Sequence, residues 1–109
     1  MPSFYRVVLT NPPTRIDFES HVALGKSHDR GTADLRRMAE GVSVNATLAQ
    51  ARSRARFLGM RFVAEVAVPG AGPISFERTG SKRGHHTLWG DPDAMLAAVV
   101  AIVPADAVD

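Results

Sequence analysis

The stretch Gly41–Pro69, GVSVNATLAQARSRARFLGMRFVAEVAVP, predicts a short strand, a helix and a longer strand in succession. Residues 42–44 follow a glycine and include two valines, which are typical of strands. Thr47 is followed three positions later by Gln50, a spacing at which each side chain can bind a backbone group at a helix start. Gly59 supplies the left-handed backbone with which helices commonly end. We therefore expect a helix between Thr47 and Gly59.

One side of this expected helix carries a narrow apolar stripe, which is suited to packing on a sheet. The stripe is formed by Leu48, Ala51, Ala55 and Leu58. Its two alanines allow a close approach of the helix to its neighbour. Arginines flank the stripe, with Arg52 and Arg56 on one side and Arg54 on the other. We expect their aliphatic stems to pack while their guanidinium groups stay in water.

Beyond Gly59 the apolar period changes from that of a helix to that of a strand. Residues on one expected face are Phe62, Ala64, Val66 and Val68, and those on the other are Arg61, Val63, Glu65 and Ala67. A proline and a glycine, residues 69 and 70, then end the strand. The whole stretch is thus predicted to be one strand, helix, strand unit.

Segments before this unit predict a strand and two helices. Residues 4–9 are rich in strand-forming side chains and are followed by two prolines. The segments Thr14–Gly25 and Thr32–Gly41 each begin with a threonine and end with a glycine, which is typical of short helices. The side chains expected to face the core are Ile16, Phe18, Val22 and Ala23 in the first and Leu35, Met38 and Ala39 in the second.

Segments after the unit predict two more strands and one more helix. Residues 74–77 alternate between apolar and polar, and a hairpin with the preceding strand is the simplest arrangement. Residues 86–89 can form another short strand. Asp91 followed by Pro92 is a specific signal for a helix start. This helix leads into a β-branched tail, residues 99–103.

Together these elements indicate an α+β fold in a single small domain, residues 1–104. We expect a mixed or mainly antiparallel sheet of about five short strands, with three or four short helices, and a frayed tail at residues 105–109. The longest apolar run, residues 95–103, is too short to span a bilayer. No signal-peptide pattern opens the chain. We therefore expect a cytoplasmic protein with no membrane partner.

The charge of the chain is unevenly distributed, although its net value is only +2. Basic residues are concentrated in the central helix and at 78–83, and acidic ones near the end. With no cysteine, disulfides and thiolate zinc sites are excluded. The four histidines lack metal-site spacing, and the adjacent pair His85 and His86 would point to opposite faces of a strand. We therefore expect no metal.

Four polar residues follow one another along the expected strands. Tyr5 and Arg6 lie near the start of the first strand, Ser43 on a second strand before a helix, and Glu77 on a later strand. This order resembles that of ADP-ribosyltransferase-like folds. In that family an early Arg or His and a strand-borne Ser or Tyr hold NAD, and a later Glu contacts the nicotinamide ribose. The resemblance thus implies NAD as a nucleotide ligand and cleavage of its glycosidic bond.

The same resemblance implies roles for individual residues. Tyr5 and Arg6 would belong to the cofactor site, with Arg6 on a phosphate or ribose, and Ser43 would support the nicotinamide side. Glu77 would stabilise the positive charge that develops as the glycosidic bond breaks. Two alternatives stay open here: Glu65 for the carboxylate, and His86 as the polar group of the site.

Two other classes of function are also compatible with the sequence. Residues 48–61 carry four arginines, Arg52, Arg54, Arg56 and Arg61, and no acid, so this helix could bind nucleic-acid phosphates. The basic segment 78–83 would add to that surface if it lies on the same side. Alternatively, Phe57, opposite the apolar stripe, could form an exposed patch for a protein partner, as in a toxin and antitoxin or immunity system.

Overall fold

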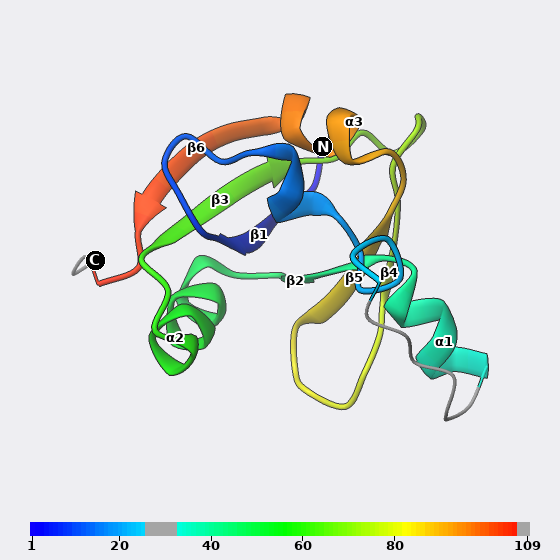
Figure 1. Ribbon diagram of the computed structural model, residues 1–109, viewed down its shortest axis with the longest axis horizontal. Coiled ribbons are helices and arrows are strands. Elements are labelled where there is room, and N and C mark those ends of the chain that lie inside the picture. Colours follow the sequence, from blue (N-terminus) through cyan, green and yellow to red (C-terminus); the bar gives the residue numbers. More distant parts are fainter. Residues whose placement is uncertain (26–32, 107–109) are drawn as a thin grey trace.

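Six antiparallel strands form one sheet in the order β4-β5-β2-β1-β3-β6 in the computed structural model, which describes residues 1–25 and 33–106 (Figure 1). The strands are β1 (Ser3–Val8), β2 (Val42–Asn45), β3 (Phe62–Ala67), β4 (Ser75–Arg78), β5 (His85–Trp89) and β6 (Val99–Pro104). The helices are α1 (Ala33–Ala39), α2 (Leu48–Leu58) and α3 (Pro92–Ala97), and a 3-10 turn, η1, spans Arg15–Phe18. The α+β prediction is confirmed, and the β-branched tail supplies the sixth strand.

Helix α2 begins and ends where the sequence predicts. The hydroxyl oxygen of Thr47 accepts a hydrogen bond from the backbone N–H of Gln50 at 3.2 Å. Gly59 takes a positive φ of 71° just after the helix. Within the stripe, Ala51 and Ala55 are fully buried, whereas Leu58 remains 49% exposed. The close approach to the sheet is therefore made by the two alanines.

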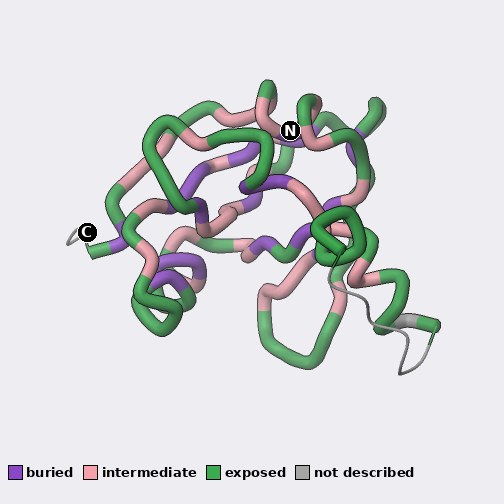
Figure 2. Tube along the Cα trace, viewed as in Figure 1, coloured by how far each residue is buried: buried purple, intermediate pink, exposed green. Residues whose placement is uncertain are grey.

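Strand β3 is buried on both faces because the sheet is covered on both sides. On one side Val63 packs with Ala51 and Ala55 of α2. On the other side Val66 belongs to the larger core, which includes Phe18 of η1 and Met95 of α3. Figure 2 shows these buried positions along the middle of the sheet and on the inner side of α2. The alternating pattern of β3 thus fixes which element covers which face.

The helix predicted for residues 14–25 is wrong, because only the 3-10 turn η1 forms there. Two backbone N–H groups, those of Thr14 and Leu9, donate to the carboxylate of Asp17 at 2.9 and 2.8 Å. This holds a tight turn, and the chain becomes extended at Glu19. Phe18 is buried as expected, but Ile16 and Val22 are more than half exposed, as they would not be on a packed helix.

Helix α1 was expected to start at Thr32, a residue that lies outside the described part of the chain. The helix ends where the backbone N–H of Gly41 donates to the carbonyl of Met38 at 3.1 Å. The expectation that Leu35 faces the core is wrong, since this side chain is 53% exposed. Of the side chains described in helix α1, only those of its last turn, Met38 and Ala39, are partly buried, so its start is exposed.

The hairpin predicted between β3 and β4 is also wrong. Strand β3 pairs with β1 and β6, and β4 pairs with β5. A strand that is apolar on both faces is stable only inside a sheet, whereas all four residues of β4 are exposed and suit an edge. Likewise, Ala105 of the expected frayed tail is buried, and its N–H donates to the carbonyl of Arg61 at 2.8 Å. Residues 107–109 lie outside the described chain.

Gly41 is needed where α1 meets β5, and this gives the first prediction. A Cβ atom at Gly41 would lie 2.5 Å from the carbonyl oxygen of Leu88 and 2.5 Å from Cγ2 of Thr87. Backbone atoms cannot yield cheaply, so Gly41→Ala should lower the free energy of unfolding by roughly 1–3 kcal/mol. Urea unfolding measures this. Gly70→Ala is the control, because a Cβ there meets nothing within 4 Å, and an equal loss in both variants would refute the crowding argument.

Candidate functional site

Strands β1 and β2 are in register at one described pair, Tyr5 and Asn45. The side chain of Arg6, the residue after Tyr5, links the two strands as well. Its Nη1 donates to the carbonyl of Ser43 at 2.7 Å, and its Nε donates to the carbonyl of Asp17 at 3.0 Å. One guanidinium therefore joins β1, β2 and the turn η1.

The electrostatics around Arg6 involve burial and one carboxylate. Burial lowers the pKa of Arg6 to about 10, and the nearby Asp17 carboxylate acts in the opposite direction. Arg6 consequently stays protonated at neutral pH. The carboxylate of Asp17 is itself buried and accepts the two backbone hydrogen bonds that shape η1. Arg6 and Asp17 thus form a structural pair.

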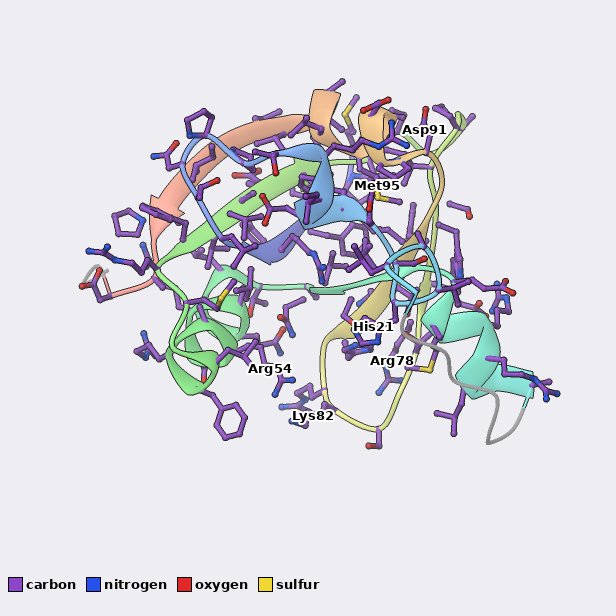
Figure 3. All side chains as sticks on the ribbon, viewed as in Figure 1. His21, Arg54, Arg78, Lys82, Asp91 and Met95 are labelled. Atoms are coloured by element: carbon purple, nitrogen blue, oxygen red, sulfur yellow. The ribbon has the colours of Figure 1, made fainter. Side chains whose placement is uncertain are left out.

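A groove of about 540 Å³ lies beside Arg6, between α2, β2 and the loop of residues 79–84 that joins β4 to β5. We call it the basic groove. Its basic side chains are Arg6, His21, Arg54, Lys82 and His85, and its polar floor includes Ser43 and Asn45. Figure 3 shows Arg54 on the α2 side of this space and Lys82 and His21 on the side of β5.

The charges of the basic groove all have one sign. Its basic residues come from four separate segments of the chain, and none of its described lining residues is Asp or Glu. The remaining wall is apolar and includes Val7, Met38, Leu58 and Met60. A concave site with apolar walls and convergent cations suits an anionic ligand that also has an apolar part.

The two walls of the basic groove are joined at Gly84. The N–H of Ala46 donates to the carbonyl of Gly84 at 2.8 Å, just before helix α2 begins. The side chain of Gln50 lies so close to Gly84 that a Cβ there would overlap it. The loop also turns back on itself, because the N–H of His85 donates to the carbonyl of Lys82 at 3.2 Å. Arg54 and Lys82 are therefore held on opposite walls.

The four arginines expected to form one basic surface lie in three different surroundings. Arg52 is buried, contrary to the expectation that its guanidinium stays in water, and its Nε donates to the carbonyl of Pro104 at 3.3 Å. Arg56 donates to the carbonyl of Ala105 at 3.2 Å. Arg61 lines a separate depression together with Arg56 and Asp106. Of the four, Arg54 alone lines the basic groove.

The residues implied for an NAD site are only partly brought together. Arg6 and Ser43 meet, through the backbone carbonyl of Ser43, and both line the basic groove. Glu77 is ion-paired with Arg37 and lines a different depression. The guanidinium of Arg37 also lies 4.1 Å from the ring centre of Trp89, so this pair helps to hold α1 against the sheet.

The other residues implied for that site lie elsewhere. Glu65 accepts a hydrogen bond from the hydroxyl of Ser3 at 2.7 Å. Tyr5 packs beside the smaller core under α2. The ring of His86 lies 4.9 Å from that of Phe4, on the face of the larger core. His85, its neighbour on the opposite face, lines the basic groove instead.

Comparison with protein-family models, with curated proteins and with solved structures gave no match to this chain. In the described residues, no helix combines the length and the apolar character needed to cross a membrane. Within the same residues, no three His, Asp or Glu side chains are grouped so that they could hold a metal ion.

The pair Arg6 and Asp17 gives a second prediction. The carboxylate of Asp17 accepts hydrogen bonds from two backbone N–H groups and compensates the positive charge of Arg6. In Asp17→Asn it is replaced by a neutral amide that has one acceptor oxygen. One of the two N–H groups loses its partner and the buried charge that offsets Arg6 disappears, so the free energy of unfolding should fall by roughly 2–4 kcal/mol. Urea unfolding measures this. Glu40→Gln makes the same chemical change at an exposed site and should have little effect; similar losses in both variants would contradict the assignment.

Proposed function

We propose that the protein binds single-stranded nucleic acid in the basic groove, with the phosphates between Arg54 and Lys82. One observation carries this proposal: basic side chains from four segments line the groove, and its described lining contains no acid. Neutralisation of phosphates by Arg and Lys supplies the sequence-independent part of nucleic-acid affinity. Because no carboxylate of the described residues lines the groove, none of them repels a phosphate that binds there.

An exposed aromatic ring beside the groove supports a nucleic acid rather than a free phosphate. Phe57 is 79% exposed although it is a large apolar side chain. The guanidinium carbon of Arg54 lies 5.4 Å from the centre of its ring. Base stacking on such a ring contributes about 1–3 kcal/mol per base in single-strand binding. Phe57 would thus take a base while Arg54 takes the adjoining phosphate.

The dimensions of the groove favour an unpaired strand. Its volume of about 540 Å³ is in the range of sites for small organic ligands and fits one nucleotide rather than a duplex. The apolar wall at Met38, Leu58 and Met60 can contact a sugar or a base edge. A duplex would instead need a broad surface or an element that enters a groove of the nucleic acid.

An NAD-using activity remains the second reading of the chain, but the geometry gives it less support. The guanidinium of Arg6 is engaged by two backbone carbonyls, and the carboxylate of Glu77 is paired with Arg37 outside the groove. A protein-interaction role would use the exposed Phe57, the same residue to which we give a base. Binding assays with RNA and with NAD separate these readings.

The third prediction concerns the phosphate contacts. Arg54→Ala and Lys82→Ala should each weaken binding of a short single-stranded oligonucleotide and reduce the slope of log K against log salt by about 0.7, the value for one phosphate contact on a single strand. Fluorescence anisotropy over a salt series measures both quantities. Arg61→Ala removes an equal charge outside the groove and is the control. If Arg61→Ala weakens binding as much as the other two, the groove is not the site.

The fourth prediction tests stacking on Phe57. Phe57→Ala should weaken binding roughly tenfold, because about 1.4 kcal/mol of stacking is lost. Phe57→Trp offers a larger ring at the same exposed position and should retain or improve affinity. The same anisotropy assay at one salt concentration compares the two variants. Equal affinity of the Ala and Trp variants would show that no base stacks there.

A further inference from the structure

One tautomer of His85 is favoured by the loop that forms a wall of the basic groove. Its Nδ1 lies 2.9 Å from the backbone carbonyl oxygen of Thr79. A carbonyl oxygen can only accept a hydrogen bond, so this contact favours the tautomer with the proton on Nδ1, and the hydroxyl of Thr79 lies 3.1 Å from the same atom. In that tautomer the neutral ring keeps Nε2 as an acceptor, on the side of the ring away from these contacts. The hydroxyl of Thr79 bonds in turn to that of Thr87 at 2.6 Å, which fixes the surroundings of the ring.

A second histidine lines the same groove from another part of the chain. His21 belongs to the turn that follows η1, and it lines one cavity together with His85, Lys82 and Arg54. Figure 3 shows where His21, Lys82 and Arg54 lie. Two imidazoles in one site can act as an acid and base pair near neutral pH. Two permanent cations, Arg54 and Lys82, can stabilise negative charge that develops between them. The groove thus combines phosphate recognition with groups that transfer protons.

Resting on the nucleic-acid binding proposed above, we propose that the basic groove cleaves single-stranded RNA without a metal. Nε2 of His85 accepts the proton of a ribose 2′-hydroxyl, and the 2′-oxygen forms a bond to the adjacent phosphorus. The bond from phosphorus to the 5′-oxygen breaks, and that oxygen takes a proton from the imidazolium of His21. The products are a 2′,3′-cyclic phosphate and a 5′-hydroxyl end. Every proton and bond is accounted for, and neither water nor a co-reactant is consumed.

Each cationic residue has a defined part in this reaction. Lys82 and Arg54 contact the non-bridging oxygens of the reacting phosphate, which gain negative charge as the 2′-oxygen attacks. Such preorganised cations act most strongly on charge that develops in the transition state. His85 and His21 lower the barrier by proton transfer, an effect of about 10²–10⁴-fold for a well-placed group. DNA lacks the 2′-hydroxyl, so it would be bound and left intact.

The fifth prediction uses a single-stranded RNA that contains all four bases and its 2′-O-methyl analogue, in the presence of EDTA. The full chain should cut the RNA, leave cyclic phosphate ends and leave the analogue intact. His85→Ala should slow cleavage about 10²–10⁴-fold while its affinity for the analogue changes less than about threefold. His86→Phe keeps the ring contact with Phe4 outside the groove and loses only the contact of Nδ1 with the carbonyl of Gly84, which still accepts from the N–H of Ala46, so it should cleave at close to the normal rate.

The two proposals fail in different ways in this experiment. If the RNA stays intact while the analogue binds normally, the proposal of RNA cleavage is refuted and the proposal of nucleic-acid binding is retained. Loss of binding to both oligonucleotides overturns both proposals. Cleavage by His85→Ala at the normal rate overturns the mechanism, because another group would then take the proton. Equal loss of cleavage in His85→Ala and His86→Phe would point to a structural effect and would also count against the mechanism.

Discussion

The guanidinium of Arg6 holds together three elements beside the basic groove, the strands β1 and β2 and the turn η1. Two carbonyl oxygens, those of Ser43 and Asp17, accept its hydrogen bonds at 2.7 and 3.0 Å. The carboxylate of Asp17 offsets the positive charge of Arg6 and accepts hydrogen bonds from two backbone N–H groups. Ser43 and Asn45 line the groove next to these contacts. The position of this groove floor relative to β1 and η1 therefore depends on Arg6.

Helix α2 serves two different surfaces with one short sequence. Its alanines bring the backbone close to the sheet, and Arg52 and Arg56 on one flank bind carbonyls at the end of β6 and just after it. Arg54 lies on the other flank and faces the groove. Spacing along the helix therefore separates arginines that stabilise the fold from the arginine that is available to a ligand. The number of arginines in α2 is therefore larger than the number that can contact a ligand in the groove.

Local signals in the sequence were sufficient for most elements of the fold. The capping box at Thr47 and Gln50, the glycine at 59 and the alternation through β3 all lie within a few residues of the structure they specify. Long-range pairing was not accessible in the same way. The partner of β3 depends on which strands can cover an edge. The turn that forms in place of the predicted helix after Thr14 is held by a hydrogen bond from the backbone N–H of Leu9 to Asp17, a contact that local periodicity does not reveal.

The candidate site was predictable only in part, for similar reasons. Strand position alone indicates Arg6 and Ser43, and these two residues meet at the carbonyl of Ser43. Glu77 instead pairs with Arg37 of α1, an element far from it in sequence. Alternation predicts that His85 and His86 face opposite sides of the strand, but it does not show that the side of His85 lines the groove. The basic loop was recognised by composition, and its position opposite Arg54 follows from Gly84 packing against Gln50.

The most direct test of the central claim is an amide-shift NMR titration with a 2′-O-methyl single-stranded oligonucleotide at low salt, which binds without being cut. Binding in the basic groove should cause saturable shifts at Asn45, Arg54 and Lys82, on the walls and floor of one groove, with β6 and α3 unaffected. Shifts centred on Arg56 and Arg61, or shifts with NAD around Arg37 and Glu77 alone, would contradict it. Complete absence of shifts with the oligonucleotide would contradict it as well.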